Sequence, residues 1–237
     1  MRLDKLLSNM GYGSRKDVKK LLKMKAVSID GIIAKDVSLH VDPEKQNVTV
    51  LGERVHYQEF IYLMMNKPAG VISATEDLYD QTVIDLLDPF HAHFNPFPVG
   101  RLDKDTEGFL LITNDGVLAH NLLSPKKHVP KVYYAKIEGR VTEEDIEAFN
   151  QGVILDDGYL TKPGKLIILK SGQVSEIELM ISEGKFHQVK RMFEAVGKKV
   201  TYLKRLSMGN LQLDQNLSLG EYRELSPDEI EKIKQKE

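Results

Sequence analysis

The chain has no cysteine among its 237 residues. It therefore cannot form a disulfide, use a thiolate as a nucleophile or bind zinc through sulfur. It also has no apolar run approaching the roughly 20 residues needed to span a bilayer. The N-terminus is charged at Arg2, Asp4 and Lys5 and lacks the apolar core of a secretory signal peptide. We therefore expect a cytoplasmic protein without a membrane segment.

Patterns typical of metal and nucleotide sites are also missing from the sequence. His91 and His93 lie two residues apart among Phe and Pro, and His120 has no partner at ligand spacing. No zinc site is therefore predicted. Gly11-x-Gly13 lacks the third glycine and the preceding strand of a dinucleotide-binding loop. We predict neither a metal nor a cofactor.

The formal net charge is only −2, but basic residues gather in two segments. Residues 1–25 contain eight Lys or Arg and two Asp, and residues 185–205 contain seven Lys or Arg and one Glu. Two basic segments in a nearly neutral chain predict a surface that binds a polyanion. The alternative is two solvated helix faces with no partner.

Local patterns near the N-terminus predict two helices followed by strands. Apolar residues recur at helical spacing from Leu3 to Met10, and a Gly-x-Gly ends that pattern. Ser14 then begins a second helix, and Asp17 completes a capping box with it. An Asp-Gly pair within residues 27–33 predicts a tight hairpin, and residues 48–50 form a further expected strand.

The segment RLDKLLSNMGYGSRKDVKKLLKMKAVSIDG resembles an S4 domain, a small RNA-binding module. The resemblance implies an S4-like domain over residues 1–51. It also implies that basic residues of the second helix contact RNA phosphates, namely Arg15, Lys16, Lys19 and Lys20. Such contacts release counterions, so binding would weaken as salt rises.

A polar stretch without periodicity, residues 52–59, is the expected linker to a larger domain over residues 60–237. Strands of this domain are predicted within residues 60–65, 110–113, 131–137, 174–181 and 200–206. Helices are predicted at 82–87, at 117–123 with Val117, His120 and Leu123 on one side, at 142–149, after 187, and from Ser226-Pro227 onward. Many strands with isolated helices predict an α+β fold with a mostly antiparallel mixed sheet.

The loop from Gly100 to Gly108 contains the carboxylate that we single out, Asp103. A glycine at each end and an Asp-Lys-Asp-Thr centre predict a loop held at a strand edge. The loop imitates the start of a calcium-binding loop, but position twelve is Asn114, where such a loop needs a bidentate Glu. We therefore reject a calcium site.

Several motifs occur in a fixed order along the chain. They are Asn66-Lys67-Pro68-x-Gly70, Gly100-Arg101-Leu102-Asp103-x-Asp105-Thr106-x-Gly108, Lys131-x-Tyr133, Glu183-Gly184-Lys185-x-His187-Gln188-Val189-Lys190-Arg191-Met192, Leu203-x-Arg205 and Gly209. This ordered set resembles the pseudouridine synthases of the RsuA type, which carry an S4 domain before the catalytic domain and modify ribosomal RNA.

The resemblance implies a catalytic role for three residues. Asp103 would be the catalytic carboxylate, acting either as a covalent nucleophile or by assisting departure of the base. Lys190 would supply a cation beside it. Tyr133 would stack on the uracil of a flipped-out uridine and help to move a proton from C5.

Further residues receive supporting roles from the same resemblance. Leu203 would pack beneath the base, and Arg101 would fill the space that the flipped uridine leaves. Lys185 and Arg191 of the second basic segment are expected to contact RNA. Tyr134 would point away from the site, and Asp105 and Thr106 would shape the loop as hydrogen-bond acceptors.

The expected activity is therefore conversion of uridine to pseudouridine in ribosomal RNA by a monomer, on free RNA or on a ribosome assembly intermediate. Residues 160–163 and the short segment after Tyr222 resemble the branch that modifies 16S RNA of the small subunit. A 23S-specific enzyme of the large subunit is the alternative within the family. A non-catalytic rRNA-binding assembly factor is the alternative of another class.

Overall fold

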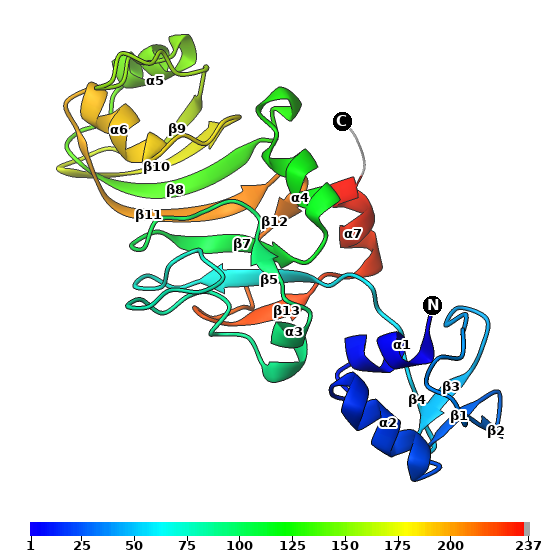
Figure 1. Cartoon of the computed structure of the whole chain (residues 1–237). Coiled ribbons are helices and arrows are strands. Elements are labelled where there is room, and N and C mark those ends of the chain that lie inside the picture. The colour runs from blue at the N-terminus through cyan, green and yellow to red at the C-terminus, as the bar shows by residue number, and fades with distance from the viewer. Residues whose placement is uncertain (235–237) are drawn as a thin grey trace. The chain divides into compact units, whose positions relative to one another are not determined.

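The computed structural model describes residues 1–234 of the chain, which form two compact units (Figure 1). The first unit consists of Met1–Ile61 together with Asp88–Asn95, and the second of Tyr62–Leu87 and the chain from Pro96 onward. The short helix α3 (Pro89–His93) therefore belongs to the first unit. Phe94 packs against the core of that unit, and His93 Nε2 lies 2.7 Å from the Ser8 carbonyl oxygen. The sequence gives no sign of this grouping.

The first unit contains two helices and a small antiparallel sheet. Helices α1 (Leu3–Asn9) and α2 (Arg15–Lys23) precede a sheet with the strand order β2-β1-β3-β4. Its strands are β1 (Val27–Ile29), β2 (Ile32–Ile33), β3 (Val48–Val50) and β4 (Glu53–Arg54). Strand β4 lies inside the segment 52–59, which was expected to be a linker.

Local signals fix the start of α2 and the first hairpin as predicted. The Asp17 amide donates to Ser14 Oγ at 3.3 Å, and the Ser14 amide donates to Asp17 Oδ2 at 3.2 Å. Asp30 and Gly31 have φ angles of 51° and 81°, which suit a tight turn between β1 and β2.

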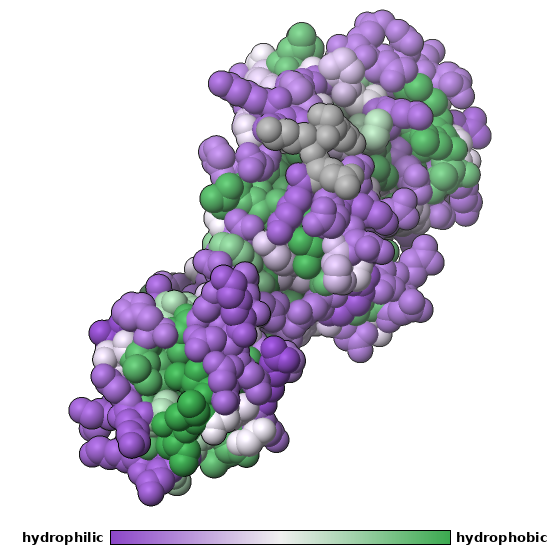
Figure 2. All heavy atoms as spheres, turned by 90° about the vertical axis from the view of Figure 1, so that its right-hand side faces the viewer, coloured by the Kyte–Doolittle hydropathy of each residue, from purple (hydrophilic) through white to green (hydrophobic). Residues whose placement is uncertain are grey.

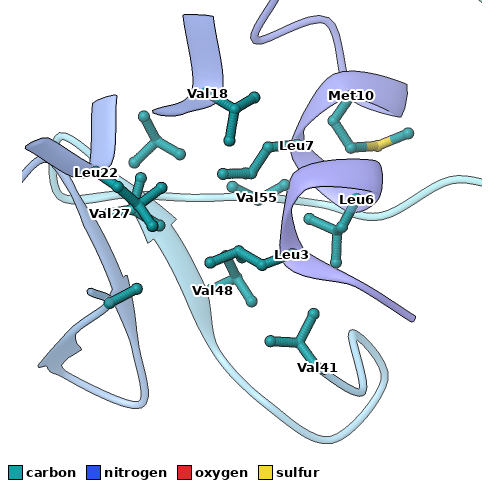
Figure 3. Close-up of a cluster of buried hydrophobic side chains, with 12 residues drawn as sticks. Leu3, Leu6, Leu7, Met10, Val18, Leu22, Val27, Val41, Val48 and Val55 are labelled. Atoms are coloured by element: carbon teal, nitrogen blue, oxygen red, sulfur yellow. The ribbon is translucent and has the colours of Figure 1, made fainter. Parts of the chain in front are cut away.

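The core of the first unit lies between the two helices and the sheet (Figure 3). Leu3 and Leu7 of α1 and Val18 of α2 are fully buried, together with Val27 of β1. Burying each such side chain contributes about 1.5–3 kcal/mol. The outward face of α2 exposes the four basic residues expected to bind RNA, Arg15, Lys16, Lys19 and Lys20.

The second unit is built on a nine-stranded sheet with the order β13-β5-β7-β11-β8-β10-β9, to which β6 and β12 add at β7 and β11. The strands are β5 (Tyr62–Lys67), β6 (Phe97–Pro98), β7 (Glu107–Thr113), β8 (Lys131–Glu138), β9 (Lys165–Lys170), β10 (Val174–Ile181), β11 (Lys199–Met208), β12 (Leu211–Gln212) and β13 (Tyr222–Glu224). All pairs are antiparallel except β7 with β11. The predicted α+β class with a mostly antiparallel mixed sheet is confirmed.

Helices cover different parts of this sheet (Figure 1). Helices α5 (Glu143–Gln151) and α6 (Gln188–Ala195) pack together through Phe149 and Phe193, whose ring centres are 4.9 Å apart. Elsewhere, α4 (Gly116–Leu123) and α7 (Pro227–Lys234) share a core with β5 and β7 that includes Leu118 and Ile233. A single 3-10 turn, Pro125–Lys127, follows α4.

One prediction about local structure was wrong. Residues 82–87 form a bridge, bends and a turn instead of a helix, although Thr82 and Asp85 make the reciprocal hydrogen bonds of a capping box. The Ile72 amide donates to the Gln81 carbonyl oxygen and the Val83 amide donates to the Ile72 carbonyl oxygen, so contacts with a neighbouring segment set the backbone here.

The predicted helix at Val117, His120 and Leu123 is confirmed as α4. These three residues share its exposed side, whereas Leu118, Ala119 and Leu122 face the core.

Hydrophilic side chains cover most of the face drawn in Figure 2, with apolar patches on each unit. Within residues 1–234, no helix has both the length and the apolar character that crossing a membrane would require.

Candidate active site

Strand register brings four side chains to one face of the central sheet. In β8, Lys131 and Tyr133 alternate with residues of the other face. In β11, Arg205 pairs with Tyr133, and Leu203 pairs with Ala135. All four side chains are at least 91% buried. The sheet therefore presents an aromatic ring, an aliphatic side chain and two cations at one place.

The loop that carries Asp103 is held by a buried ammonium group. Lys67, at the end of β5, donates from Nζ to the carbonyl oxygens of Asp103 at 3.1 Å, Thr106 at 2.9 Å and Pro68 at 2.9 Å. Burial lowers the pKa of Lys67 to about 8, although the carboxylates of the loop partly oppose this shift. Lys67 is therefore a clamp for the backbone of the loop.

Other contacts fix the same loop from the segment after β5. The amide of Leu102 donates to Ser73 Oγ at 3.0 Å, and that hydroxyl donates to the Leu102 carbonyl oxygen at 3.0 Å. The Gly70 amide donates to the Lys104 carbonyl oxygen at 2.7 Å. The loop is thus rigid on both sides of Asp103, as a precise reactive geometry requires.

Gly108 lies where the loop that carries Asp103 continues into strand β7. Its φ angle is +102°, and an added Cβ would lie 2.3 Å from the backbone oxygen of Arg205. Only glycine fits where β7 runs parallel to β11 at this distance.

Two side chains from the region of α6 flank the Asp103 carboxylate. Lys190 Nζ lies 3.1 Å from Oδ2, and His187 Nε2 lies 3.5 Å from Oδ1. His187 precedes the helix in a left-handed conformation, with φ of 49°, and stacks on Phe186 with ring centres 3.7 Å apart. The Asp103 side chain remains 27% exposed, so a substrate can reach it.

Lys190 also contacts Asp105, at 2.7 Å. Burial alone would lower the pKa of Lys190, but its hydrogen bonds to Asp105 and Asp103 outweigh that effect and raise the pKa above its usual value. The hydrogen bond from Lys190 likewise lowers the pKa of Asp105. Lys190 therefore stays protonated and keeps a positive charge beside Asp103. Asp105 was expected to be a loop-shaping hydrogen-bond acceptor, and its carboxylate accepts the hydrogen bond from Lys190.

A cavity of about 120 Å³ lies over this face of the sheet. Its lining includes six of the residues singled out in the sequence: Arg101, Asp103, Thr106, Tyr133, Lys185 and Leu203. The volume is well below the roughly 300 Å³ at which drug-sized pockets begin. The cavity is therefore of a size for one small ring rather than a drug-sized ligand.

Some predicted residues lie elsewhere. Lys190 contacts Asp103 without lining the cavity. Arg191 forms ion pairs with Asp156 and Asp157, and its side chain is only 15% exposed. Tyr134 donates its hydroxyl to Glu176 at 2.7 Å, in agreement with a structural role.

Four residues of the site received no role from the sequence: Lys67, Lys131, His187 and Arg205. Each lies inside one of the ordered motifs, so their positions were visible. Their roles depend on burial and on contacts between distant segments, which a motif does not reveal.

Comparisons with known proteins identify similar chains. Residues 61–195 match the family described as RNA pseudouridylate synthase, and residues 1–47 match the S4 domain. YtzG, an uncharacterized RNA pseudouridine synthase of Bacillus subtilis (strain 168), is 61% identical over 231 residues, which cover 97% of each chain. The ribosomal small subunit pseudouridine synthase A of Yersinia pestis is 40% identical and covers 98% of each chain.

Two further similarities extend over almost the whole chain. The ribosomal large subunit pseudouridine synthase B of Bacillus subtilis (strain 168) is 37% identical, covering 98% of this chain and 95% of the relative. A crystal structure of a pseudouridylate synthase has 36% identity and a TM-score of 0.69, and the match covers 98% of this chain and 99% of that chain.

Proposed function

Because the chain belongs to the RNA pseudouridylate synthase family and carries an S4 domain, we propose that it converts one uridine of ribosomal RNA into pseudouridine. Enzymes of this family are isomerases that act on uridines in RNA. We assign the substrate to 16S RNA of the small subunit and the role of catalytic carboxylate to Asp103.

The observation that carries the assignment of Asp103 is its environment. Its carboxylate lies between Lys190 and His187, on a clamped loop, at the edge of a cavity bounded by Tyr133 and Leu203. A positioned carboxylate with an adjacent cation suits nucleophilic attack or electrostatic assistance at a sugar carbon.

The reaction breaks the N1–C1′ bond of uridine and forms a C5–C1′ bond. The electron pair of the broken bond stays on the base, which rotates while Asp103 acts at the sugar. C5 then bonds to C1′, and the hydrogen that C5 carried is lost as N1 gains a proton. Tyr133 and Leu203 would hold the ring on its two faces during this rotation.

The uridine must leave its base stack to reach this cavity. Arg101, which lines the cavity and is exposed, would occupy the vacated space. Lys185 lines the same cavity, and the basic face of α2 would bind RNA phosphates. The Arg191 ion pairs leave its guanidinium less available, so its contact with RNA would require those pairs to open.

The choice of 16S RNA follows the residues near 160–163 and the short segment after Tyr222, and it fits the relative named as a small-subunit enzyme. The relative named as a large-subunit enzyme makes 23S RNA the alternative. Mapping pseudouridines in both rRNAs from cells with and without this gene tests the choice. Loss of one 16S pseudouridine is expected, and loss of a 23S site alone would contradict it.

A further inference from the structure

Two buried cations of the cavity have no carboxylate partner. Lys131 is 9% exposed, and its Nζ donates to the Val129 carbonyl oxygen at 2.9 Å. Arg205 is 2% exposed, and its Nε donates to the Phe109 carbonyl oxygen at 2.8 Å. Its Nη2 atom is buried with no hydrogen-bond partner. Within residues 1–234, no ion pair involves either side chain.

Burying a cation without a counter-ion is costly, and proteins accept the cost mainly at functional sites. Burial and the neighbouring Arg205 guanidinium lower the pKa of Lys131 to about 8. A carboxylate beside Lys131 and Arg205 would offset the cost of burying these cations, but the Asp103 carboxylate already contacts Lys190 and His187. A ligand that carries negative charge would supply the partner that Lys131 and Arg205 lack.

A second polar group in the cavity is also unsatisfied. The Thr106 hydroxyl is buried with no hydrogen-bond partner, and Thr106 lines the cavity together with Lys131 and Arg205. Unsatisfied buried polar groups are rare in folded proteins. Their concentration around one cavity indicates a polar, electron-rich occupant.

We propose that Lys131 and Arg205 stabilise the negative charge that the uracil acquires when its N1–C1′ bond breaks. This inference rests on the proposed function. The electron pair of that bond passes to the base, where the charge spreads over N1 and the carbonyl oxygens. The two cations would face these oxygens until C5 bonds to C1′ and the charge is neutralised. Preorganised charges of this kind lower a barrier without reorganisation during the reaction.

An RNA phosphate is a weaker candidate for the same place. The cavity is small, and Tyr133 and Leu203 supply apolar walls that suit the faces of a flat ring. A phosphate contact would change RNA affinity and its salt dependence. Stabilisation of the base anion would instead change the chemical step.

The test compares Lys131→Met with Lys136→Met in the full chain. Lys136 lies on the same strand, but it is exposed on the opposite face. Single-turnover rates are measured with saturating rRNA, together with RNA affinity and thermal stability. We expect Lys131→Met to slow the reaction about 100-fold, with unchanged affinity and folding, and Lys131→Arg to restore most of the rate. Lys136→Met should match the wild type.

A second substrate separates charge stabilisation from simple support of the pocket. RNA with 5-fluorouridine at the target position has a base that bears negative charge more easily, so it needs less help from Lys131. We therefore compare the single-turnover rate of the wild type with that of Lys131→Met on each substrate. The ratio of these two rates should be clearly smaller for loss of 5-fluorouridine than for loss of uridine. Equal ratios on both substrates would overturn the inference.

Other outcomes are equally decisive. A Lys131→Met enzyme that reacts at the wild-type rate, or that loses only RNA affinity and salt dependence, would overturn the inference while leaving the proposed function intact. A wild-type enzyme that is inactive on every rRNA substrate would instead overturn the proposed function on which the inference rests.

Discussion

The Lys190 ammonium contacts the Asp103 carboxylate at 3.1 Å, across a gap of 87 positions in the sequence. Because Asp105 binds the same ammonium at 2.7 Å, one lysine joins α6 to two acidic positions of the loop. This contact orients the Asp103 carboxylate and places a positive charge beside it.

Lys190→Met is expected to lower the rate of pseudouridine formation about 100-fold, because the carboxylate loses the charge beside it. Asp105→Asn is the matched comparison, since it keeps Lys190 beside Asp103. The Asp105 side chain is 72% exposed, and exposed ion pairs contribute roughly 0–1 kcal/mol. Asp105→Asn should therefore lower the rate of pseudouridine formation by less than about tenfold. Single-turnover assays measure both variants, and equal losses would contradict the proposed hierarchy.

Lys67→Met should destabilise the second unit, because three backbone carbonyl oxygens lose a shared donor. A buried polar group left unsatisfied costs about 1–3 kcal/mol. The free energy of unfolding, measured in urea, should fall by at least that amount. Ser73→Ala provides a milder perturbation of the same loop, so it should cost less. If Lys67→Met unfolds like the wild type, the clamp is not important for stability.

Gly108→Ala should be severely destabilising, by about 3 kcal/mol or more, because the new methyl group meets the Arg205 backbone at a positive φ angle. Gly116→Ala is the control, since an added Cβ at that position meets nothing within 4 Å. It should change stability by no more than about 1 kcal/mol, in the stabilising direction. Thermal unfolding of the two variants gives the comparison, and similar melting temperatures would refute this account of Gly108.

Replacing Lys16 and Lys19 by Ala should weaken RNA binding through the S4 domain. Each lost phosphate contact lowers the slope of log affinity against log salt by about 0.7–0.9. The doubly substituted protein should therefore show a slope reduced by about 1.5, while the single-turnover rate at saturating RNA stays the same. Lys35→Ala, an exposed change elsewhere in this unit, should leave the slope unchanged. A slope that does not respond to Lys16 and Lys19 would remove α2 from the RNA-binding surface.

Local chemistry made much of the fold predictable. The Ser14–Asp17 cap and the Asp30-Gly31 turn act within a few residues, so the sequence alone reveals them. The resemblances to the S4 domain and to pseudouridine synthases are confirmed by the family matches. Residues 82–87 do not form the predicted helix, because backbone hydrogen bonds of Gln81 and Val83 with Ile72 hold this segment in another conformation.

The remaining features depend on contacts between distant segments. The sequence does not reveal that Phe94 packs with the first unit or that Arg205 pairs with Tyr133. Motifs indicated Asp103 and Lys190, and their predicted proximity agrees with the structure. The burial of Lys67, Lys131 and Arg205 depends on how distant strands pair in the sheet. A sequence motif that contains these residues does not show whether they are buried.

The central claim is that Asp103 is the catalytic carboxylate, and release of tritium from rRNA labelled at C5 of uridine tests it most directly. The exchange of Asp103 for Asn is nearly isosteric, so folding and RNA affinity should match those of the wild type, and tritium release should fall to the level without enzyme. An Asp103→Asn protein that binds RNA normally and still releases tritium near the wild-type rate would contradict the account.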